Sequence, residues 1–268
     1  MPRIAERFER MRRQGRAGLV TYTTAGDPDL PVSAEILRAL DRAGADVLEV
    51  GVPFSDPLAD GPVIQRATER ALASGTSLRR VLTMVASIRA GVTAPIVLFS
   101  YVNPIARMGF ETFAAAAAAA GVDGVLTLDL PIEEAGEFRG ILDRSGLDTI
   151  FLLSPTTTDA RIRKAAELGR GFLYGISRLG VTGARDRVAA GAEAMVGRIR
   201  AHTSLPIALG FGISTPAHVA EVGAYADAAV VGSALVALIA EASGSPRLIE
   251  RVEEYVRDLK SACVAFRP

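Results

Sequence analysis

The chain alternates short apolar runs with longer segments in which apolar residues recur at helical spacing. Most of the short runs are too apolar to leave one face in water, which is typical of parallel strands buried on both sides. These eight runs cover residues 18–23, 46–50, 96–101, 124–128, 149–153, 171–176, 207–210 and 228–231. The helical segments between and after them cover residues 31–43, 63–90, 110–120, 133–145, 159–168, 189–202, 216–222 and 235–242. The pattern therefore predicts eight strand–helix units in series.

Two further amphipathic helices are predicted at the ends of the chain. Ile4, Phe8 and Met11 fall on one face of an N-terminal helix that would cover part of the core. A charged amphipathic stretch over residues 245–262 follows the last unit. Eight strand–helix units indicate an α/β protein with a (β/α)8 TIM barrel and right-handed crossovers, carrying an extra N-terminal and an extra C-terminal helix.

A doubly wound open sheet is the alternative fold. Its first strand–helix turn should carry a Gly-x-Gly-x-x-Gly fingerprint, and the sequence TTAGDP at residues 23–28 does not. No linker and no change in composition divides the chain. We therefore expect a single barrel domain over residues 1–268.

Composition agrees with this fold and excludes several function classes. The chain has 268 residues, close to the roughly 250 of a typical barrel, and its 30 basic and 30 acidic residues leave a net charge of zero. Nucleic-acid binding has no compositional support, and no apolar run approaches the roughly 20 residues of a membrane span. The N-terminus lacks the apolar region of a secretory signal, and Glu6 and Glu9 argue against an organellar presequence. Because Cys263 is the single cysteine, no disulfide can form within the chain, and we expect a cytoplasmic enzyme.

Two carboxylates lie close to the end of the second predicted strand. Glu49 is inside the apolar run, where an unpaired charge is costly to bury. Asp60 lies eleven residues later, in a Pro- and Gly-rich loop that can fold back over the strand end. Since reactive groups of a barrel lie at the C-terminal ends of its strands, this pair is predicted to perform acid–base chemistry, helped by Tyr174 at the end of strand six. The structural alternatives are a backbone-bonded buried carboxylate, a loop or cap residue, and a packing tyrosine.

Glycine-rich segments follow the seventh and eighth strands. They read GFGIS at residues 210–214 and VVGS at residues 230–233, the second running directly into a helix. Glycines let backbone N–H groups approach an anion, and the helix start adds the positive end of its dipole. These loops are the usual phosphate site of a barrel, and the alternative is that the glycines only turn the chain. The polar loop at residues 177–185 is a candidate lid or else a surface connection.

The scarcity of some residue types narrows the chemistry further. The two lysines, Lys164 and Lys260, both lie on predicted helices, so a Schiff-base mechanism has no amine at a strand end. The two histidines, His202 and His218, also lie on helices, and no metal site is predicted. Proton transfer by the two carboxylates remains. Carbon–carbon cleavage by carboxylates alone requires a substrate that carries its own electron sink.

Several motifs strongly resemble the tryptophan synthase α subunit family. They are TAGDP at residues 24–28, EVGVPFSDPLADGP at 49–62, YVNPI at 101–105, GVTG at 180–183 and GFGIS at 210–214. The resemblance covers essentially the whole chain in order. It implies a lyase of tryptophan biosynthesis that cleaves indole-3-glycerol phosphate into indole and glyceraldehyde 3-phosphate by a retro-aldol reaction. The indole ring, once protonated at C3, is then the electron sink, and this chain needs neither metal nor cofactor.

The resemblance also implies roles for individual residues. Glu49 would protonate C3 and take up the glycerol hydroxyl proton, Asp60 would accept the indole N–H, and Tyr174 would lie near Glu49. Residues around the phosphate would be Gly183, Phe211, Gly212, Gly232 and Ser233. Residues walling the indole pocket, or else ordinary barrel core, would be Tyr22, Tyr101, Leu126, Leu128 and Phe211. Thr182 of the lid would meet Asp60 on closure, and Ser100 and Gly175, near the pocket, depart from the commonest family pattern.

A partner protein follows from the same resemblance. Asp56-Pro57 and Asn103-Pro104 match segments that in the family face a β subunit. That subunit carries pyridoxal phosphate, receives indole through a tunnel and joins it to serine, so an α2β2 heterotetramer is expected. The alternatives are a stand-alone lyase that releases free indole, a phosphate-binding regulatory subunit, and a sugar-phosphate isomerase, although the isomerase usually needs a strand-end histidine or lysine.

Overall fold

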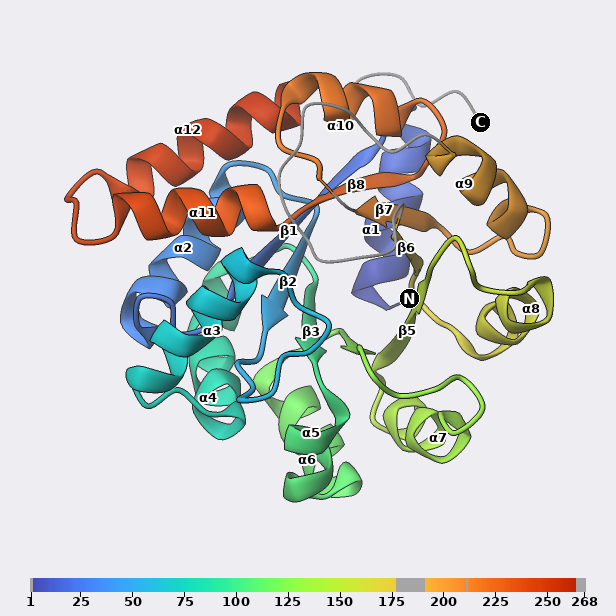
Figure 1. Ribbon diagram of the computed structural model, residues 1–268, viewed down its shortest axis with the longest axis horizontal. Helices are drawn as coiled ribbons and strands as arrows, with labels where there is room; N and C mark the ends of the chain where they lie inside the picture. The colour runs from blue at the N-terminus through green and yellow to red at the C-terminus, as the bar shows by residue number, and fades with distance from the viewer. Residues whose placement is uncertain (1, 177–190, 211, 264–268) are drawn as a thin grey trace.

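The structure, a computed structural model, describes residues 2–176, 191–210 and 212–263. Within these residues, eight parallel strands close into a barrel in sequence order, with β8 paired to β1 (Figure 1). The strands are β1 (Gly18–Thr24), β2 (Val47–Gly51), β3 (Ile96–Ser100), β4 (Gly124–Thr127), β5 (Asp148–Leu153), β6 (Leu173–Ile176), β7 (Ile207–Gly210) and β8 (Ala228–Val231). The barrel prediction is confirmed, and every predicted strand is present with its ends shifted by no more than two residues.

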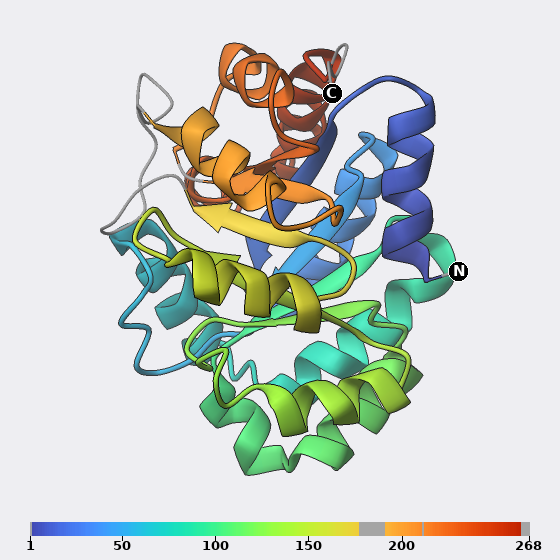
Figure 2. The ribbon, with the colours of Figure 1, turned by 90° about the vertical axis from the view of Figure 1, so that its right-hand side faces the viewer.

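Helices surround the barrel on its outer face (Figures 1 and 2). They are α2 (Leu30–Arg42), α3 (Pro62–Ala73), α4 (Leu78–Ile88), the 3-10 turn η1 (Arg89–Gly91), α5 (Val102–Met108), α6 (Phe110–Ala120), α7 (Gly136–Arg144), α8 (Asp159–Leu168), α9 (Ala192–Arg200), α10 (Pro216–Gly223) and α11 (Ser233–Ala242). The two extra helices are α1 (Arg3–Arg13) and α12 (Leu248–Ser261), as predicted. None of the helices described is both long and apolar enough to cross a membrane.

Two helix predictions were incomplete. The segment 63–90 forms two helices, because the chain turns between α3 and α4 at Gly75, whose φ of +79° favours glycine. The polar run Ser-Gly-Thr-Ser at residues 74–77 interrupts the apolar pattern and was the signal of this turn. Helix α5 was not predicted; Pro104 lies in its first turn, where proline is tolerated, and the chain leaves it at Gly109 with φ of +88°.

Alternate residues of each strand point into the barrel or toward the helices. Near the N-terminal ends of the strands the interior is filled by apolar side chains, among them Val20, Val47, Val97, Leu126, Ile150 and Phe172. Helix α1 adds Ile4, Phe8 and Met11 to this cluster, and the rings of Phe8 and Phe172 lie 5.5 Å apart. Helix α1 therefore closes this end of the barrel (Figure 2).

Candidate active site

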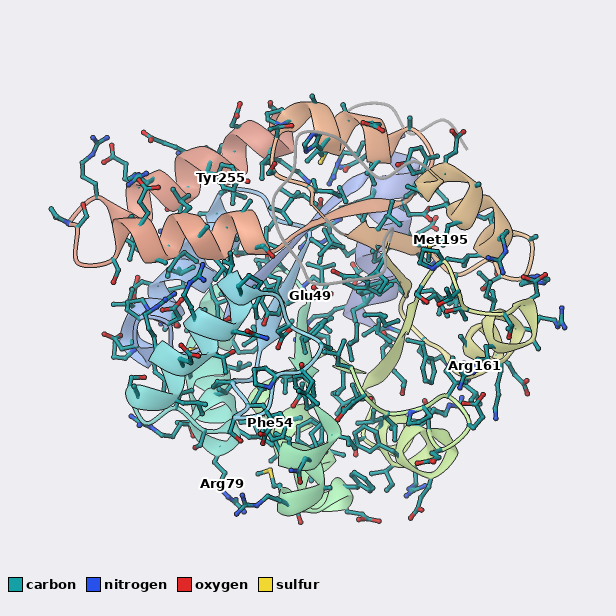
Figure 3. All side chains as sticks on the ribbon, viewed as in Figure 1. Glu49, Phe54, Arg79, Arg161, Met195 and Tyr255 are labelled. Carbon is teal, nitrogen blue, oxygen red and sulfur yellow. The ribbon has the colours of Figure 1, made fainter. Side chains whose placement is uncertain are left out.

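Glu49 points into the barrel above the apolar cluster. It lies two residues beyond Val47, an interior residue, and pairs in the ladder with Tyr22 of β1 and Val97 of β3. In Figure 3 it lies near the middle of the ring of strands. Its side chain is fully buried, and neither carboxylate oxygen has a hydrogen-bond partner among the described residues. A carboxylate bonded to backbone, the structural alternative, is therefore wrong for the described part of the chain.

Burial without a partner changes the protonation of this carboxyl group. Loss of water disfavours the charged form and raises the pKa of Glu49 to about 8. Glu49 therefore carries its proton at neutral pH. Such a group can donate the proton to a substrate and later take one back.

The raised pKa of Glu49 predicts how stability depends on pH. Between the ordinary value of 4.5 and about 8, the folded protein holds a proton that the unfolded chain has released. The free energy of unfolding therefore falls as pH rises through this window. We expect Glu49→Gln, which cannot ionise, to gain stability relative to the wild type, on the order of 4 kcal/mol between about pH 4.5 and about pH 8.

Urea denaturation of both proteins at the two pH values measures this change. Glu254→Gln on the exposed side of α12 is the control, and its stability relative to the wild type should stay constant over the same range. A stability difference between Glu49→Gln and the wild type that does not vary with pH would contradict a buried, proton-bearing carboxyl group.

Asp60 is held on the loop after β2 by hydrogen bonds to both its backbone and its side chain. Its N–H donates to the Pro57 carbonyl at 3.0 Å, and its carbonyl accepts from Gln65 Nε2 at 2.8 Å. Tyr101 Oη donates to Asp60 Oδ2 at 3.2 Å and accepts from the Ala59 N–H at 3.1 Å. Asp60 does not cap α3, whose N-cap is Gly61. Tyr101 therefore ties the loop and its carboxylate to the mouth of the barrel.

The protonation of Asp60 differs from that of Glu49. Burial raises the pKa of Asp60 to about 6, and the hydrogen bond from Tyr101 opposes this rise. Asp60 is therefore ionised at neutral pH, while Glu49 is neutral. With one acid neutral and the other ionised, the first can donate a proton, and the second can accept a hydrogen bond and stabilise a positive charge.

Tyr22 and Tyr174 lie on the barrel wall beside these acids. Burial, then the negative charges of Asp60 and Glu49, raise the pKa of Tyr22, and burial followed by Glu49 and Tyr22 raises the pKa of Tyr174. Both carboxylates thus contribute to the raised pKa of Tyr22, and Glu49 is also its partner in the β1–β2 ladder. Tyr174 is the second of the four residues of β6 and so lies within the strand rather than at its end.

Glycines on the neighbouring strands leave room for both tyrosine rings. A Cβ added at Gly51 would overlap the Tyr22 hydroxyl, and one added at Gly210 would lie 2.5 Å from Tyr174 Oη. Any larger residue at these two positions must displace a tyrosine. The glycines at the ends of β2 and β7 therefore help to set the shape of the mouth.

Apolar and aromatic side chains complete the wall. Leu126 is buried in the barrel interior, and Leu128, two residues later, is partly buried. Phe99 was missed; its ring packs edge-on to Tyr22 with centroids 5.3 Å apart. The alternation from Val97 to Phe99 in the predicted strand was the signal that could have identified it.

Ser100 and Gly175 do not line the interior. Ser100 is buried and donates through Oγ to the Tyr101 carbonyl at 2.9 Å. A Cβ added at Gly175 would lie 3.0 Å from Leu209 and 3.6 Å from Met195, a residue of α9. Gly175 thus faces the helix layer, and its departure from the family pattern does not reshape the pocket.

The predicted phosphate-binding residues are partly described. Gly212 has a φ of +76°, which favours glycine, and Gly232 is the N-cap of α11, whose first residue is Ser233. A Cβ added at Gly232 would lie 3.5 Å from Cβ of Tyr22, so this helix start borders the same mouth. Backbone N–H groups at a helix start suit an anion. The other two predicted phosphate contacts, Gly183 and Phe211, and the predicted lid residue Thr182 lie outside the described residues.

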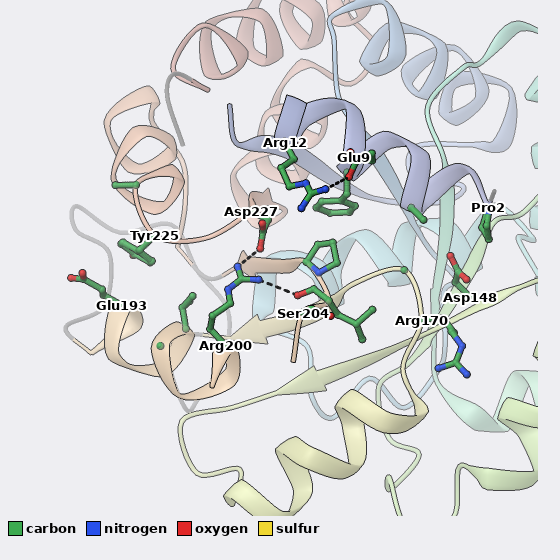
Figure 4. Close-up of a pocket in the computed structure, with 18 residues that line it drawn as sticks. Pro2, Glu9, Arg12, Asp148, Arg170, Glu193, Arg200, Ser204, Tyr225 and Asp227 are labelled. Atoms are coloured by element: carbon green, nitrogen blue, oxygen red, sulfur yellow. Dashed lines mark hydrogen bonds and ion pairs between the residues drawn. The ribbon is translucent and has the colours of Figure 1, made fainter. Parts of the chain in front are cut away.

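A separate groove of about 1030 Å3 lies at the opposite, N-terminal end, between α1 and α9 (Figure 4). Its arginines are engaged: Arg200 pairs with Asp227, and Arg12 pairs with Glu9 at 2.8 Å. Because catalytic groups of barrels lie at the other end, we do not assign this groove to the reaction. Over residues 2–176, 191–210 and 212–263, no cluster of three or more His, Cys, Asp or Glu side chains is placed to hold a metal ion.

Comparisons with known proteins agree over the whole length of the chain. The family model described as tryptophan synthase alpha chain matches residues 8–264. The tryptophan synthase alpha chain of Geotalea uraniireducens is 51% identical over 265 residues and 99% of each chain, and that of Geobacter sulfurreducens is 51% identical over 98% of this chain and 99% of the relative.

Solved structures give the same result. Tryptophan synthase subunit alpha from Legionella pneumophila matches with a TM-score of 0.90 at 36% identity, covering 98% of both chains. A structure of Mycobacterium tuberculosis tryptophan synthase matches with a TM-score of 0.90 at 38% identity, again over 98% of both chains. The barrel described above is the shared architecture.

Proposed function

Because this chain belongs to the tryptophan synthase alpha chain family, we propose that the mouth of its barrel is the catalytic site, with Glu49 and Asp60 as the reacting acids. The chain is a carbon–carbon lyase of tryptophan biosynthesis. It cleaves indole-3-glycerol phosphate into indole and glyceraldehyde 3-phosphate. The observation that best supports the site is the Glu49 carboxyl group, fully buried inside the barrel without a described partner.

Glu49 begins the reaction as an acid. Its proton passes to C3 of the indole ring, so that the ring nitrogen becomes a positively charged iminium and Glu49 becomes a carboxylate. The raised pKa of Glu49 supports this role, because it keeps the proton in place until substrate binds. The Glu49 charge helps to raise the pKa of Tyr174, so the Tyr174 hydroxyl keeps its proton beside the Glu49 carboxylate.

Asp60 serves the nitrogen of the same ring. Its ionised carboxylate accepts the indole N–H and stabilises the positive charge that forms there. The hydrogen bond from Tyr101 orients the carboxylate for this contact. Thr182 of the lid meets Asp60 when the site closes, by analogy with the family.

Bond cleavage returns the proton to Glu49. The Glu49 carboxylate removes the proton of the hydroxyl on the glycerol carbon that is bonded to C3. That carbon becomes the aldehyde of glyceraldehyde 3-phosphate, the carbon–carbon bond breaks, and its electron pair neutralises the ring. Indole leaves, Glu49 is again protonated, and atoms and charges balance within this chain without a cofactor.

Substrate binding divides between two parts of the mouth. The phosphate lies at the start of α11 and the loop after β7, and the residues proposed to contact it are Gly183, Phe211, Gly212, Gly232 and Ser233. The indole ring lies against the apolar wall, and the residues proposed to line it are Tyr22, Tyr101, Leu126, Leu128 and Phe211. The two parts hold the glycerol carbons between them, beside Glu49.

The chain works with a β subunit, and we infer an α2β2 heterotetramer in the cytoplasm with pyridoxal phosphate bound to β. Asp56 and Asn103 are exposed, Pro57 and Pro104 lie beside them, and Leu58 is 90% exposed, the most of the large apolar side chains described. The exposure of these residues leaves them free to contact a protein partner. A stand-alone lyase receives no support from the relatives found.

An assay of indole release tests the function directly. The purified chain, given indole-3-glycerol phosphate, should release indole and glyceraldehyde 3-phosphate in equal amounts, and a β subunit should raise the rate. No product with or without β would reject the lyase assignment. If the rate of indole release were the same with and without the β subunit, the result would favour the stand-alone enzyme.

Binding to the β subunit tests the interface. We expect Asn103→Arg, which places a bulky charge on the exposed face of α5, to weaken the affinity for β by about tenfold or more, since interface centres exclude unpaired charge. Calorimetric titration measures the affinity. Glu254→Arg on α12 is the control, and an equal loss of affinity in both variants would argue against this interface.

A further inference from the structure

The groove at the N-terminal end of the barrel contains a buried acid that the described residues leave without a partner. This acid is Asp148, the first residue of β5, and Figure 4 places it at one end of the groove, beside Arg170. We propose that the groove binds a small organic cation, whose ammonium or guanidinium group pairs with Asp148 and whose apolar body lies along the groove. The inference does not depend on the reaction proposed at the mouth.

The carboxylate of Asp148 is buried and unpaired. Only 7% of the residue is exposed, on the side that lines the groove. Oδ2 is enclosed without a hydrogen-bond partner among the described residues, and a Cβ added at Gly171 would lie 3.0 Å from it. Oδ1 likewise has no hydrogen bond or ion pair to the part of the chain that the structure describes. Because an unpaired buried charge is costly, a cation that reaches this carboxylate gains a favourable interaction.

Three other aspartates at the same end of the barrel have the partners that Asp148 lacks. They are Asp46, Asp123 and Asp227, which stand directly before β2, β4 and β8. Each of them, like Asp148, donates its backbone N–H to a carbonyl at the start of the preceding strand. Their carboxylates accept backbone N–H groups from Leu19, Ile96 and Ile207 and pair with basic side chains that include Arg16, Arg3 and Arg200. At these three strands the chain itself supplies the cation.

Two local features leave the fourth position open. The backbone N–H that would correspond to those of Leu19, Ile96 and Ile207 belongs to Asp123, and it donates to the Ile96 carbonyl at 2.8 Å instead. The nearby Arg170 donates through Nη1 to the Glu167 and Gly169 carbonyls, at 3.2 and 2.8 Å, and no ion pair joins these described side chains of Arg170 and Asp148. A cation from outside the chain can therefore take this place.

Asp148 carries the charge that such a ligand needs. Burial and then the negative charge of Asp123 raise the pKa of Asp148 to about 6, with Arg170 opposing the rise and Asp143 adding to it. The carboxylate is thus mostly ionised above about pH 7.

The size and lining of the groove indicate the rest of the ligand. Its volume of about 1030 Å3 is enough for a small molecule. Apolar walls come from Ala5 and Phe8 of α1 and from Leu205 and Pro206 before β7. The arginines Arg12 and Arg200, paired with Glu9 and Asp227, offer no free charge to an anion. A ligand with one positive group and an apolar body is therefore the class that fits.

Titration with two small probes tests the site. Benzylamine carries the positive group, and benzyl alcohol, of nearly the same size, carries none. In an NMR titration of the full chain at about pH 7.5, we expect benzylamine to bind at least about tenfold more tightly, because hydrogen bonds between charged groups are the strong ones. Benzylamine should also shift the amide signals of Gly171, Leu205 and Ala224, which line the groove.

Asp148→Asn removes the charge and keeps the shape of the side chain. We expect its affinity for benzylamine to fall by about tenfold or more, to the level of benzyl alcohol. Glu193→Gln is the matched control, because it removes an exposed carboxylate at the other end of the same groove (Figure 4). It should leave the affinity unchanged.

Equal affinity of the wild type for the two probes would overturn the proposal, and so would signals that shift only around the mouth of the barrel. Unchanged affinity in Asp148→Asn, or an equal loss in Glu193→Gln, would also overturn it, because the attraction would then not come from Asp148. The comparison of the two probes on the wild type needs no variant, so it decides the question even if Asp148→Asn fails to fold.

Discussion

We expect Glu49→Gln to lower kcat for indole release by about a thousandfold, within the range typical of losing a general acid–base group. The amide of glutamine has the size and shape of the protonated carboxyl group but no acidic proton for C3. The same residue is also the proposed base in bond cleavage, so one substitution should affect both steps. A continuous assay of indole formation with saturating substrate measures the loss.

Phosphate affinity separates a catalytic loss from a structural one. Glu49→Gln should bind glycerol 3-phosphate, a non-reacting fragment, as tightly as the wild type does, because the proposed phosphate site is at α11 and not at β2. Glu254→Gln on α12 should keep full activity. Equal turnover by the wild type and Glu49→Gln would overturn the assignment of Glu49 as the acid.

We expect Asp60→Asn to lower kcat/KM by about a hundredfold or more and to remove the acid limb of its pH profile. In the wild type this limb follows Asp60, whose pKa of about 6 means that the carboxylate is lost as pH falls below that value. The amide cannot stabilise positive charge on the indole nitrogen, and one charge interaction in a water-excluded site is worth a factor of this size. A pH series of initial rates between about pH 5 and about pH 9 measures both effects.

The alkaline limb is the internal reference for Asp60→Asn. It follows Glu49, with a pKa of about 8, and should persist in the variant. Asp258→Asn on α12 is the control for an exposed aspartate and should retain both limbs. An acid limb that survives unchanged in Asp60→Asn would assign that limb to another group.

The barrel could be predicted from the sequence because parallel strands buried on both faces are continuous apolar runs. The break between α3 and α4 was missed although the sequence marks it, because the run Ser-Gly-Thr-Ser at residues 74–77 is a turn signal inside the segment 63–90. Helix α5 was missed for a different reason. It is seven residues long and begins directly at the end of β3, so it offers too little periodic pattern to detect.

The sequence indicated the candidate site residues but not their electrostatics. A charge inside the apolar run identified Glu49, and the loop composition identified Asp60. Their opposite protonation states depend on how completely each is buried, which no spacing reveals.

Helix α1 packs against the N-terminal end of the barrel and closes it. The two products therefore share one exit, the mouth at the C-terminal ends of the strands. Glyceraldehyde 3-phosphate and indole both leave past the rim through which the substrate entered, and the side of that rim next to the exposed Leu58 and Asn103 is the proposed partner surface. The route that indole takes therefore depends on which protein is bound at the rim of the barrel and on the order in which the two products leave.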